Sequence, residues 1–135
     1  MAFEFPQKVL FKHCDPAGIV FYPRYFEMMN DCVEALFDMV LGAPFETLHK
    51  DGGVPTAQIQ TRFAAPSYHG DRLALRLSIT AVGRSSADYH LTAHCQSELR
   101  FETTATLVHV GPQGRPTPWP EPLRSKLIEC KDEVR

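Results

Sequence analysis

One stretch of the chain decides the fold: residues 23–42 read PRYFEMMNDCVEALFDMVLG. Apolar side chains recur along it every three or four positions, which is the period of an α-helix. Pro23 suits the first helical position, because its fixed φ fits there and its missing N–H would have no helical partner. Gly42 supplies the left-handed residue on which helices often end. We therefore expect one long helix from Pro23 to Leu41.

Outside this stretch the hydrophobic period changes to two. Extended segments are expected within residues 4–12 and over residues 57–63, 73–82, 87–95 and 101–110. The last three are joined by short turns, which favours an antiparallel meander. The apolar arc of the helix is wide, since Met28, Ala35 and Met39 extend it, so we expect a sheet to wrap it. The predicted fold is α+β, with one long central helix inside a curved antiparallel sheet of about five strands.

The chain has the length and composition of one ordinary globular domain. It has 135 residues and a mass of 15.2 kDa, with 44% hydrophobic and 22% charged residues, which argues against disorder. We expect a single domain over residues 1–135. Five of the eleven prolines lie within residues 111–122. Residues 111–135 are therefore expected to form a Pro-rich irregular segment and a short terminal helix over 123–134.

The charge balance excludes some classes of partner. Fourteen Lys and Arg residues face sixteen Asp and Glu residues, for a net charge of -2. Nucleic acid and anionic membranes call for a concentrated basic field, so neither is expected as a main partner. No apolar run approaches the roughly 18–20 residues of a membrane span, and the N-terminus lacks a signal-peptide pattern. With four scattered cysteines, we expect free thiols and a cytoplasmic location.

A candidate site for chemistry lies just before the predicted helix. Asp15 sits in a turn-forming loop near the helix start, where unpaired N–H groups and the positive end of the helix dipole lie. Such N–H groups can hold a carbonyl oxygen as it becomes an oxyanion, while a carboxylate attacks the carbonyl or activates water. Pro23 has no N–H, so the Tyr22 amide is the best donor. Alternatively, Asp15 is only an Asx-turn residue of an Asp-Pro loop.

Residues 13–25, HCDPAGIVFYPRY, resemble the active-site loop of hotdog-fold acyl-CoA thioesterases, specifically the 4-hydroxybenzoyl-CoA thioesterase family. That family has the pattern H/D-x-D-x-x-G-[IV]-V-[FYW], followed a few positions later by a tyrosine. It is matched here by His13, Asp15, Gly18, Ile19, Val20, Phe21 and Tyr25. The resemblance implies a hotdog fold and hydrolysis of an acyl-CoA thioester to a free acid and coenzyme A. It implies no metal and no cofactor, since coenzyme A arrives as part of the substrate.

The resemblance also implies roles for residues of this loop. Asp15 becomes the catalytic carboxylate, as nucleophile or as general base, and the Tyr22 amide becomes the oxyanion donor. His13 and Gly18 are counted with them as catalytic. His13 would orient the loop or the thioester, and Gly18 would let the thioester approach the backbone closely. The alternatives are a surface hydrogen bond for His13 and a simple turn for Gly18.

Four further residues are predicted to bind substrate on the same resemblance. Tyr25 closes the motif, and Asn30 occupies the helix position where hydroxybenzoyl-specific members carry an acid that contacts the ring hydroxyl. Arg84 and Ser85 lie in a turn where family members hold the phosphates of coenzyme A with basic and hydroxyl groups. The alternative for Arg84 is a solvated hairpin arginine.

The resemblance favours an aromatic acyl group of the 4-hydroxybenzoyl or benzoyl kind. Three alternatives remain: a thioesterase for short or medium acyl chains, a hotdog hydratase, and a non-catalytic acyl-CoA-binding protein of this fold. A second hotdog lineage places its carboxylate on the central helix, so Glu27 or Glu34 is a fallback for Asp15. We expect a homodimer or homotetramer, because several strands carry apolar residues on both faces.

Overall fold

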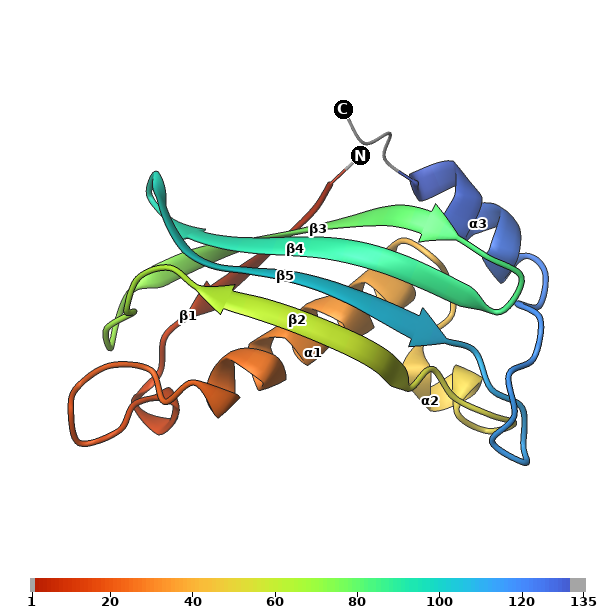
Figure 1. Cartoon of the computed structure of the whole chain (residues 1–135), viewed down its shortest axis with the longest axis horizontal. Helices are drawn as coiled ribbons and strands as arrows, with labels where there is room; N and C mark the ends of the chain where they lie inside the picture. The colour runs from red at the N-terminus through yellow and green to blue at the C-terminus, as the bar shows by residue number, and fades with distance from the viewer. Residues whose placement is uncertain (1, 132–135) are drawn as a thin grey trace.

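A five-stranded antiparallel sheet curves around one long helix in the computed structural model, which describes residues 2–131 (Figure 1). The strands are β1 (Phe3–Lys8), β2 (Thr56–Phe63), β3 (Arg72–Val82), β4 (Ser86–Cys95) and β5 (Glu98–Val108). The helices are α1 (Pro23–Met39), α2 (Phe45–Leu48) and α3 (Leu123–Cys130), with a 3-10 turn over Phe11–His13. The predicted α+β arrangement of a long helix wrapped by about five strands is confirmed.

The central helix α1 begins at Pro23, as predicted, and ends at Met39 rather than Leu41. Gly42 follows with a φ of +64°, a conformation that glycine adopts without strain, so its predicted role as a stop is confirmed. The prediction that Met39 widens the apolar arc is wrong, because its side chain is 73% exposed. At this end of the helix Leu36 and Phe37 occupy the buried face.

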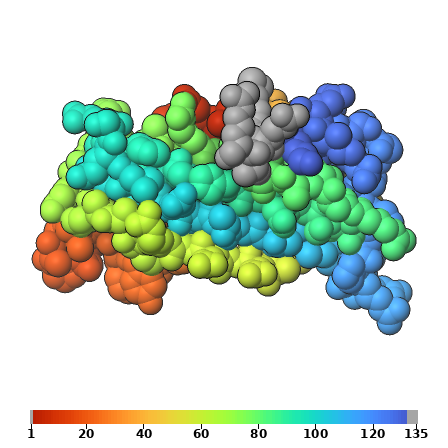
Figure 2. Space-filling model, turned by 45° about the horizontal axis from the view of Figure 1, so that its top comes forward, coloured from red at the N-terminus to blue at the C-terminus, as the bar shows by residue number. Residues whose placement is uncertain are grey.

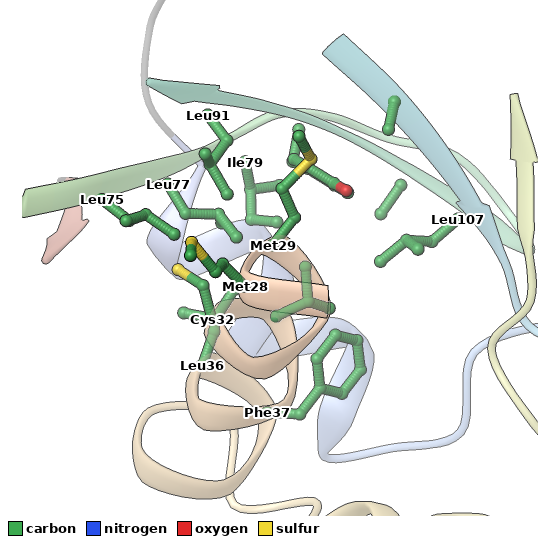
Figure 3. Packing of buried hydrophobic residues seen from close by; sticks show 14 of the residues in the cluster. Met28, Met29, Cys32, Leu36, Phe37, Leu75, Leu77, Ile79, Leu91 and Leu107 are labelled. Carbon is green, nitrogen blue, oxygen red and sulfur yellow. The ribbon is translucent and has the colours of Figure 1, made fainter. Parts of the chain in front are cut away.

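The core lies between α1 and the concave face of the sheet (Figure 3). The helix contributes Met28, Met29, Cys32, Leu36 and Phe37, and the sheet contributes Leu75, Leu77, Ile79, Leu91 and Leu107. None of these side chains is more than 3% exposed. Along β3 and β4 the inward residues are buried and the outward ones are not, as expected for strands with one covered face. Burial of apolar surface, worth about 25 cal/mol per Å², therefore fixes α1 against the sheet.

The strands follow the order β1-β3-β4-β5-β2. The predicted meander is confirmed, since β4 pairs antiparallel with both β3 and β5. β2 lies at the edge of the sheet and pairs with β5, with Phe63 opposite Phe101. Every residue of β2 except Thr61 is exposed. The helix therefore covers the β2 side of the sheet less completely than the β3 side.

Several boundaries differ from the prediction. β1 ends at Lys8, and the chain then makes a 3-10 turn, in which the His13 imidazole accepts the Leu10 N–H. The β4–β5 connection is tighter than expected, with Gln96 at a φ of +56°, so β5 begins at Glu98. The short helix α2 was not predicted. α3 ends at Cys130, and the expected helical residues 132–134 lie outside the described residues.

Replacing Phe37 by Ala is expected to lower the free energy of unfolding by about 3–5 kcal/mol. Phe37 is fully buried, and its ring centroid lies 5.3 Å from that of Phe45 and 6.5 Å from that of Trp119, so truncation leaves a cavity. Met39→Ala on the same helix is the matched control, with an expected change below about 0.5 kcal/mol. Urea unfolding followed by circular dichroism measures both, and equal losses would contradict this assignment of the buried face.

Candidate active site

The loop before α1 folds back on itself as a short antiparallel ribbon. The Asp15 N–H donates to the Ile19 carbonyl at 3.0 Å, and the Phe21 N–H donates to the His13 carbonyl at 2.9 Å. Gly18 makes the reversal at a φ of +82°, a region that favours glycine. A Cβ at Gly18 would meet nothing within 4 Å. The backbone conformation, and not close packing within the chain, is therefore what requires glycine there.

The Asp15 carboxylate is half-buried and takes part in the loop structure. Its Oδ1 accepts the Ala17 N–H at 2.9 Å, which is the Asx turn that the alternative interpretation anticipated. A carboxylate offers two oxygens and about four acceptor positions, and this bond does not use Oδ2. The turn and a chemical role for Asp15 are therefore compatible.

The Tyr22 amide lies at the start of α1 and points away from the helix, as the first amides of a helix do. Tyr22 is the N-cap residue and already has helical angles, with φ -53° and ψ -33°. Among residues 2–131, its N–H donates no main-chain hydrogen bond. The next residue is Pro23, which has no N–H. The positive end of the helix dipole strengthens the attraction of this amide for a negatively charged oxygen.

His13 is buried, being only 4% exposed, and does not lie on the surface. Its Nδ1 accepts the Leu10 N–H at 2.8 Å, which places the proton of the neutral ring on Nε2. Burial, and after it the positive charge of Lys12, lowers the pKa of His13 below 6.5. The imidazole is therefore neutral at pH 7 and has one N–H left to donate. Its role in orienting the loop or the thioester stays a prediction.

An apolar cleft of about 510 Å³ opens beside this loop. Its walls are formed by Ile19, Val20, Tyr22, Tyr25, Phe63, Ala64, Ala65 and Pro66. Asp15 does not line the cleft, but its main chain pairs with Ile19, which does. The structure therefore brings Tyr22 and Tyr25 into the wall of an apolar cleft, with His13, Asp15 and Gly18 in the ribbon that carries Ile19 of that wall.

Phe63, at the end of β2, was not predicted as a site residue. Its ring centroid lies 5.7 Å from that of Tyr25, 5.9 Å from that of Tyr22 and 6.3 Å from that of Phe26. Tyr25 is 4% exposed, and burial raises the pKa of its hydroxyl. The rings of Tyr22, Tyr25 and Phe63 make one side of the cleft aromatic. Sequence alone could not find Phe63, because its contacts depend on the pairing of β2 with β5.

A second cavity of about 260 Å³ lies further along α1, between this helix and β2. Its lining is mostly apolar and includes Phe26 and Ile59. Asn30 lines it, so this predicted substrate-binding residue does face a cavity. Tyr89 of β4 also lines it and was not predicted. Burial raises the pKa of Tyr89 to about 12, which keeps its hydroxyl protonated at physiological pH.

Arg100 of β5 holds the loop that forms one wall of the first cleft. Its guanidinium donates to Asp71 Oδ2 at 2.6 Å and to the Pro66 carbonyl at 3.1 Å, and its Nε lies 2.8 Å from Glu98 Oε1. The side chain is 10% exposed, so its charge is compensated by these carboxylates. Sequence reasoning missed Arg100, because its main partner Asp71 is 29 residues away along the chain.

The residues predicted to hold the phosphates of coenzyme A lie at the opposite end of the sheet from Asp15. Arg84 and Ser85 form the β3–β4 turn, and their carbonyls accept the N–H groups of Trp119 and His109. β3 leads to this turn over 11 residues, or about 36 Å. Figure 2 shows the two ends apart, with the orange loop at the left and the blue segment after β5 at the right. One chain does not bring Arg84 and Asp15 into one site.

Within residues 2–131, no group of three or more His, Cys, Asp or Glu side chains is arranged to hold a metal ion. No helix in this part of the chain is both long enough and apolar enough to cross a membrane. The four cysteines, Cys14, Cys32, Cys95 and Cys130, are free thiols, as predicted.

The loop, the helix and the strand order together define the class of protein. Residues 9–127 match the sequence profile of the Thioesterase-like superfamily, and this chain belongs to that family. Its fold is the hotdog fold of thioesterases, as predicted, and the protein is a thioester hydrolase.

Individual relatives agree with this placement. The 1,4-dihydroxy-2-naphthoyl-CoA hydrolase of Synechococcus elongatus is 27% identical over 130 residues, covering 93% of this chain and 94% of the relative. The structure of a gentisyl-coenzyme A thioesterase is 25% identical with a TM-score of 0.84, covering 93% of this chain and 99% of the other. A 1,4-dihydroxy-2-naphthoyl-CoA thioesterase from Synechocystis has the same fold, with a TM-score of 0.88 at 19% identity and coverage of 96% and 97%.

Asp71→Asn is expected to lower the free energy of unfolding at pH 7 by about 1–3 kcal/mol, because buried Arg100 loses its charged acceptor. The hydrogen bond from Arg100 holds the pKa of Asp71 below 3.8. A carboxyl with a depressed pKa stabilises the fold above its ordinary pKa and loses that contribution as the pH falls through the folded-state value. The wild type is therefore expected to lose more stability than the variant below about pH 4.

Denaturant titrations at pH 7 and pH 3 make this comparison, with Asp38→Asn as the control on the exposed face of α1. An Asp71→Asn variant as stable as the Asp38→Asn control at pH 7 would contradict the role assigned to the Arg100 contacts.

Proposed function

We propose that this protein hydrolyses an aromatic acyl-CoA thioester to a free acid and coenzyme A, as a cytoplasmic enzyme of one hotdog domain. The observation that carries the proposal is the unpaired Tyr22 N–H at the start of α1, beside the ribbon that holds Asp15. An amide in this position can bind the carbonyl oxygen of a thioester and stabilise it as negative charge develops. The reaction consumes one water and needs no group beyond substrate, water and this chain.

Asp15 can act in two ways in this reaction. As a nucleophile it attacks the carbonyl carbon, the C–S bond breaks, coenzyme A leaves as the thiol, and water hydrolyses the resulting anhydride. As a general base it removes a proton from the water that attacks the same carbon. Single-turnover hydrolysis in ¹⁸O-water tests the nucleophilic route, because the label can enter the enzyme's carboxylate only when Asp15 has formed the anhydride and water attacks the Asp15 carbonyl carbon.

The two cavities beside α1 support an aromatic acyl group. The cavity at Asn30 is apolar and holds about 260 Å³, and the cleft at Tyr25 leads outward past the reacting end. The acyl group would lie beside Asn30, and the chain that carries the sulfur would lie along the cleft. The named activities of the relatives also concern aromatic acyl-CoA thioesters, dihydroxynaphthoyl and gentisyl. A benzoyl or 4-hydroxybenzoyl group is the simplest member of this class.

Binding of the coenzyme A phosphates by Arg84 and Ser85 calls for a second copy of the chain. These residues lie about 36 Å from the Asp15 end along β3, so they can only serve the site of a neighbouring subunit. β2 offers an exposed edge for such a neighbour, and Ile59 and Phe63 beside it are 40% and 45% exposed. Both features are typical of an interface. We propose a homodimer or a homotetramer built on this edge, and light scattering of the purified protein determines which.

Asp15→Asn is expected to reduce kcat for benzoyl-CoA by at least about a hundredfold, because the carboxylate that attacks or activates water is lost. Release of coenzyme A is followed with a thiol reagent. Asp38→Asn, on the exposed face of α1, is the matched control and is expected to keep wild-type activity. Tyr22→Phe is also expected to stay within about threefold of wild type, since the main-chain amide and not the phenol is the donor.

The same assay separates the alternatives. Tight binding of benzoyl-CoA with no thiol release in the wild type would favour a non-catalytic binding protein. Loss of enoyl absorbance without free thiol would favour a hydratase. Faster hydrolysis of short or medium aliphatic thioesters than of benzoyl-CoA would favour an aliphatic thioesterase. Full activity in Asp15→Asn would remove Asp15 from the mechanism and direct attention to Glu27 or Glu34.

Arg84→Ala is expected to raise KM for benzoyl-CoA about two- to fivefold, because one cation facing the phosphates is lost at an exposed position. The KM for the benzoyl thioester of N-acetylcysteamine, which has no phosphates, is expected to stay unchanged. Arg76→Ala is the control, since Arg76 is exposed on the outer sheet face and pairs with Glu4. An equal rise in KM for both thioesters would show that Arg84 acts through structure and not through phosphate binding.

A further inference from the structure

We infer that Tyr89 hydrogen-bonds an oxygen substituent on the acyl ring, in the cavity it shares with Asn30, and so determines specificity for hydroxylated aromatic thioesters. This inference rests on the proposed function and deepens it, because it names a substrate class and a residue that selects it. Neither the sequence motif nor the resemblance pointed to Tyr89.

Tyr89 lies on the inner face of β4, which is the face that packs against α1. It is opposite Ile79 of β3 and Ala105 of β5 in the strand register, and it is 4% exposed. The small side chain of Ala105 leaves room beside the ring on the β5 side. Cys32 of α1 is near enough to raise the pKa of Tyr89 further. The tyrosine side chain therefore reaches from the sheet toward the helix that carries Asn30.

None of the side-chain hydrogen bonds found within residues 2–131 involves the Tyr89 hydroxyl. In the same part of the chain, the solvent-inaccessible polar side-chain atoms that make no hydrogen bond are Ser67 Oγ and Arg100 Nε, the latter in ion-pair contact with Glu98. The Tyr89 hydroxyl is not one of them, so it is reached from the cavity that Tyr89 lines. Buried hydroxyls are normally paired, since an unpaired one costs free energy. A hydroxyl that opens into an apolar cavity is satisfied when a ligand oxygen enters.

Asn30 gives the cavity a second polar group. Its amide can both donate and accept, and it lines the same cavity as Tyr89. The eight residues from Tyr22 to Asn30 span about 12 Å along the helix axis. A hydrogen bond of about 2.9 Å at each end of this span leaves roughly 6 Å for the part of the substrate between the two bonded oxygens. That length suits one aromatic ring with a carbonyl at one end and an oxygen substituent at the other.

The surrounding walls make this pair selective. Most of the other lining residues, among them Phe26, Met29, Val33 and Leu107, are apolar and offer no hydrogen bond to a polar substituent, and Thr56 of β2 is the remaining polar one. A hydroxylated ring therefore gains its hydrogen bonds at Tyr89 and Asn30, whereas an unsubstituted ring leaves both groups unpaired. A site built in this way rejects the analogue that lacks the hydroxyl.

The test compares wild type with Tyr89→Phe on two matched pairs of substrates. The pairs are benzoyl-CoA with 4-hydroxybenzoyl-CoA, and 2-naphthoyl-CoA with 1,4-dihydroxy-2-naphthoyl-CoA. For at least one pair, Tyr89→Phe is expected to lower kcat/KM of the hydroxylated member roughly tenfold and to change the unsubstituted member less than about twofold. Tyr68→Phe is the matched control, because Tyr68 is 53% exposed and lines neither cavity.

Two measurements separate recognition from a structural role. Tyr89→Phe is expected to melt at the wild-type temperature or above it, since no hydrogen bond within the described chain is lost. In an inactive Asp15→Asn background, calorimetry is expected to show weaker binding of 4-hydroxybenzoate or 1,4-dihydroxy-2-naphthoate on Tyr89→Phe, with unchanged binding of the parent acid. A lower melting temperature with equal losses for both members of each pair would assign Tyr89 to the fold and overturn the inference.

The outcomes also distinguish this inference from the proposal beneath it. A wild type that hydrolyses aromatic acyl-CoA thioesters while Tyr89→Phe keeps every hydroxylated-to-unsubstituted ratio would overturn the inference alone. A wild type that hydrolyses none of the four substrates would overturn the proposed function, and the inference with it.

Discussion

The burial of α1 against the concave face of the sheet is the constraint on which the other features depend. Side chains such as Cys32 and Phe37 have no exposed surface, so sliding or turning the helix would move apolar groups into water. The helix start is thereby fixed at one end of the sheet. That position determines where the Tyr22 amide emerges and where the loop carrying Asp15 must lie. The chemistry of the site follows from packing in the core.

The walls of the site are held differently from the core. The ribbon of the loop is fixed by main-chain bonds between Asp15 and Ile19 and between Phe21 and His13. The opposite wall is fixed through the charged side chain of Arg100. Polar contacts of this kind define direction and distance more strictly than apolar contacts do. The site thus combines a packed apolar scaffold with a rim whose geometry is determined by hydrogen bonds.

Much of the fold could be predicted because its signals are local. The start of α1 at Pro23, the stop at Gly42 and the three strands of the meander all follow from neighbouring residues and their periodicity. The place of β2 beside β5 could not be predicted, since no local pattern states which strand lies at an edge. Met39 was misplaced because apolar character alone does not say which side of a last helical turn meets the sheet.

The residues of the candidate site also form two groups, those that the sequence could indicate and those that it could not. Asp15, Tyr22 and Gly18 stand in one contiguous motif, so the sequence could indicate them together. Arg100, Phe63 and Tyr89 come from three different strands and meet the site only after the sheet has formed. The distance of Arg84 from Asp15 was equally hidden, because sequence separation does not reveal the length of a strand in space. Residues that act through tertiary contacts leave no linear pattern.

The wall of the apolar cleft beside the Asp15 loop has a consequence for redesign of the enzyme. Ala64 and Ala65 form part of it, and they are attached to β5 by their N–H groups at the Arg100 carbonyl. Neither side chain belongs to the packed core. Larger residues at these two positions would narrow the opening while leaving the interior untouched. Substrate range in this lineage can therefore be altered, by selection or by engineering, without the loss of stability that accompanies changes in the core.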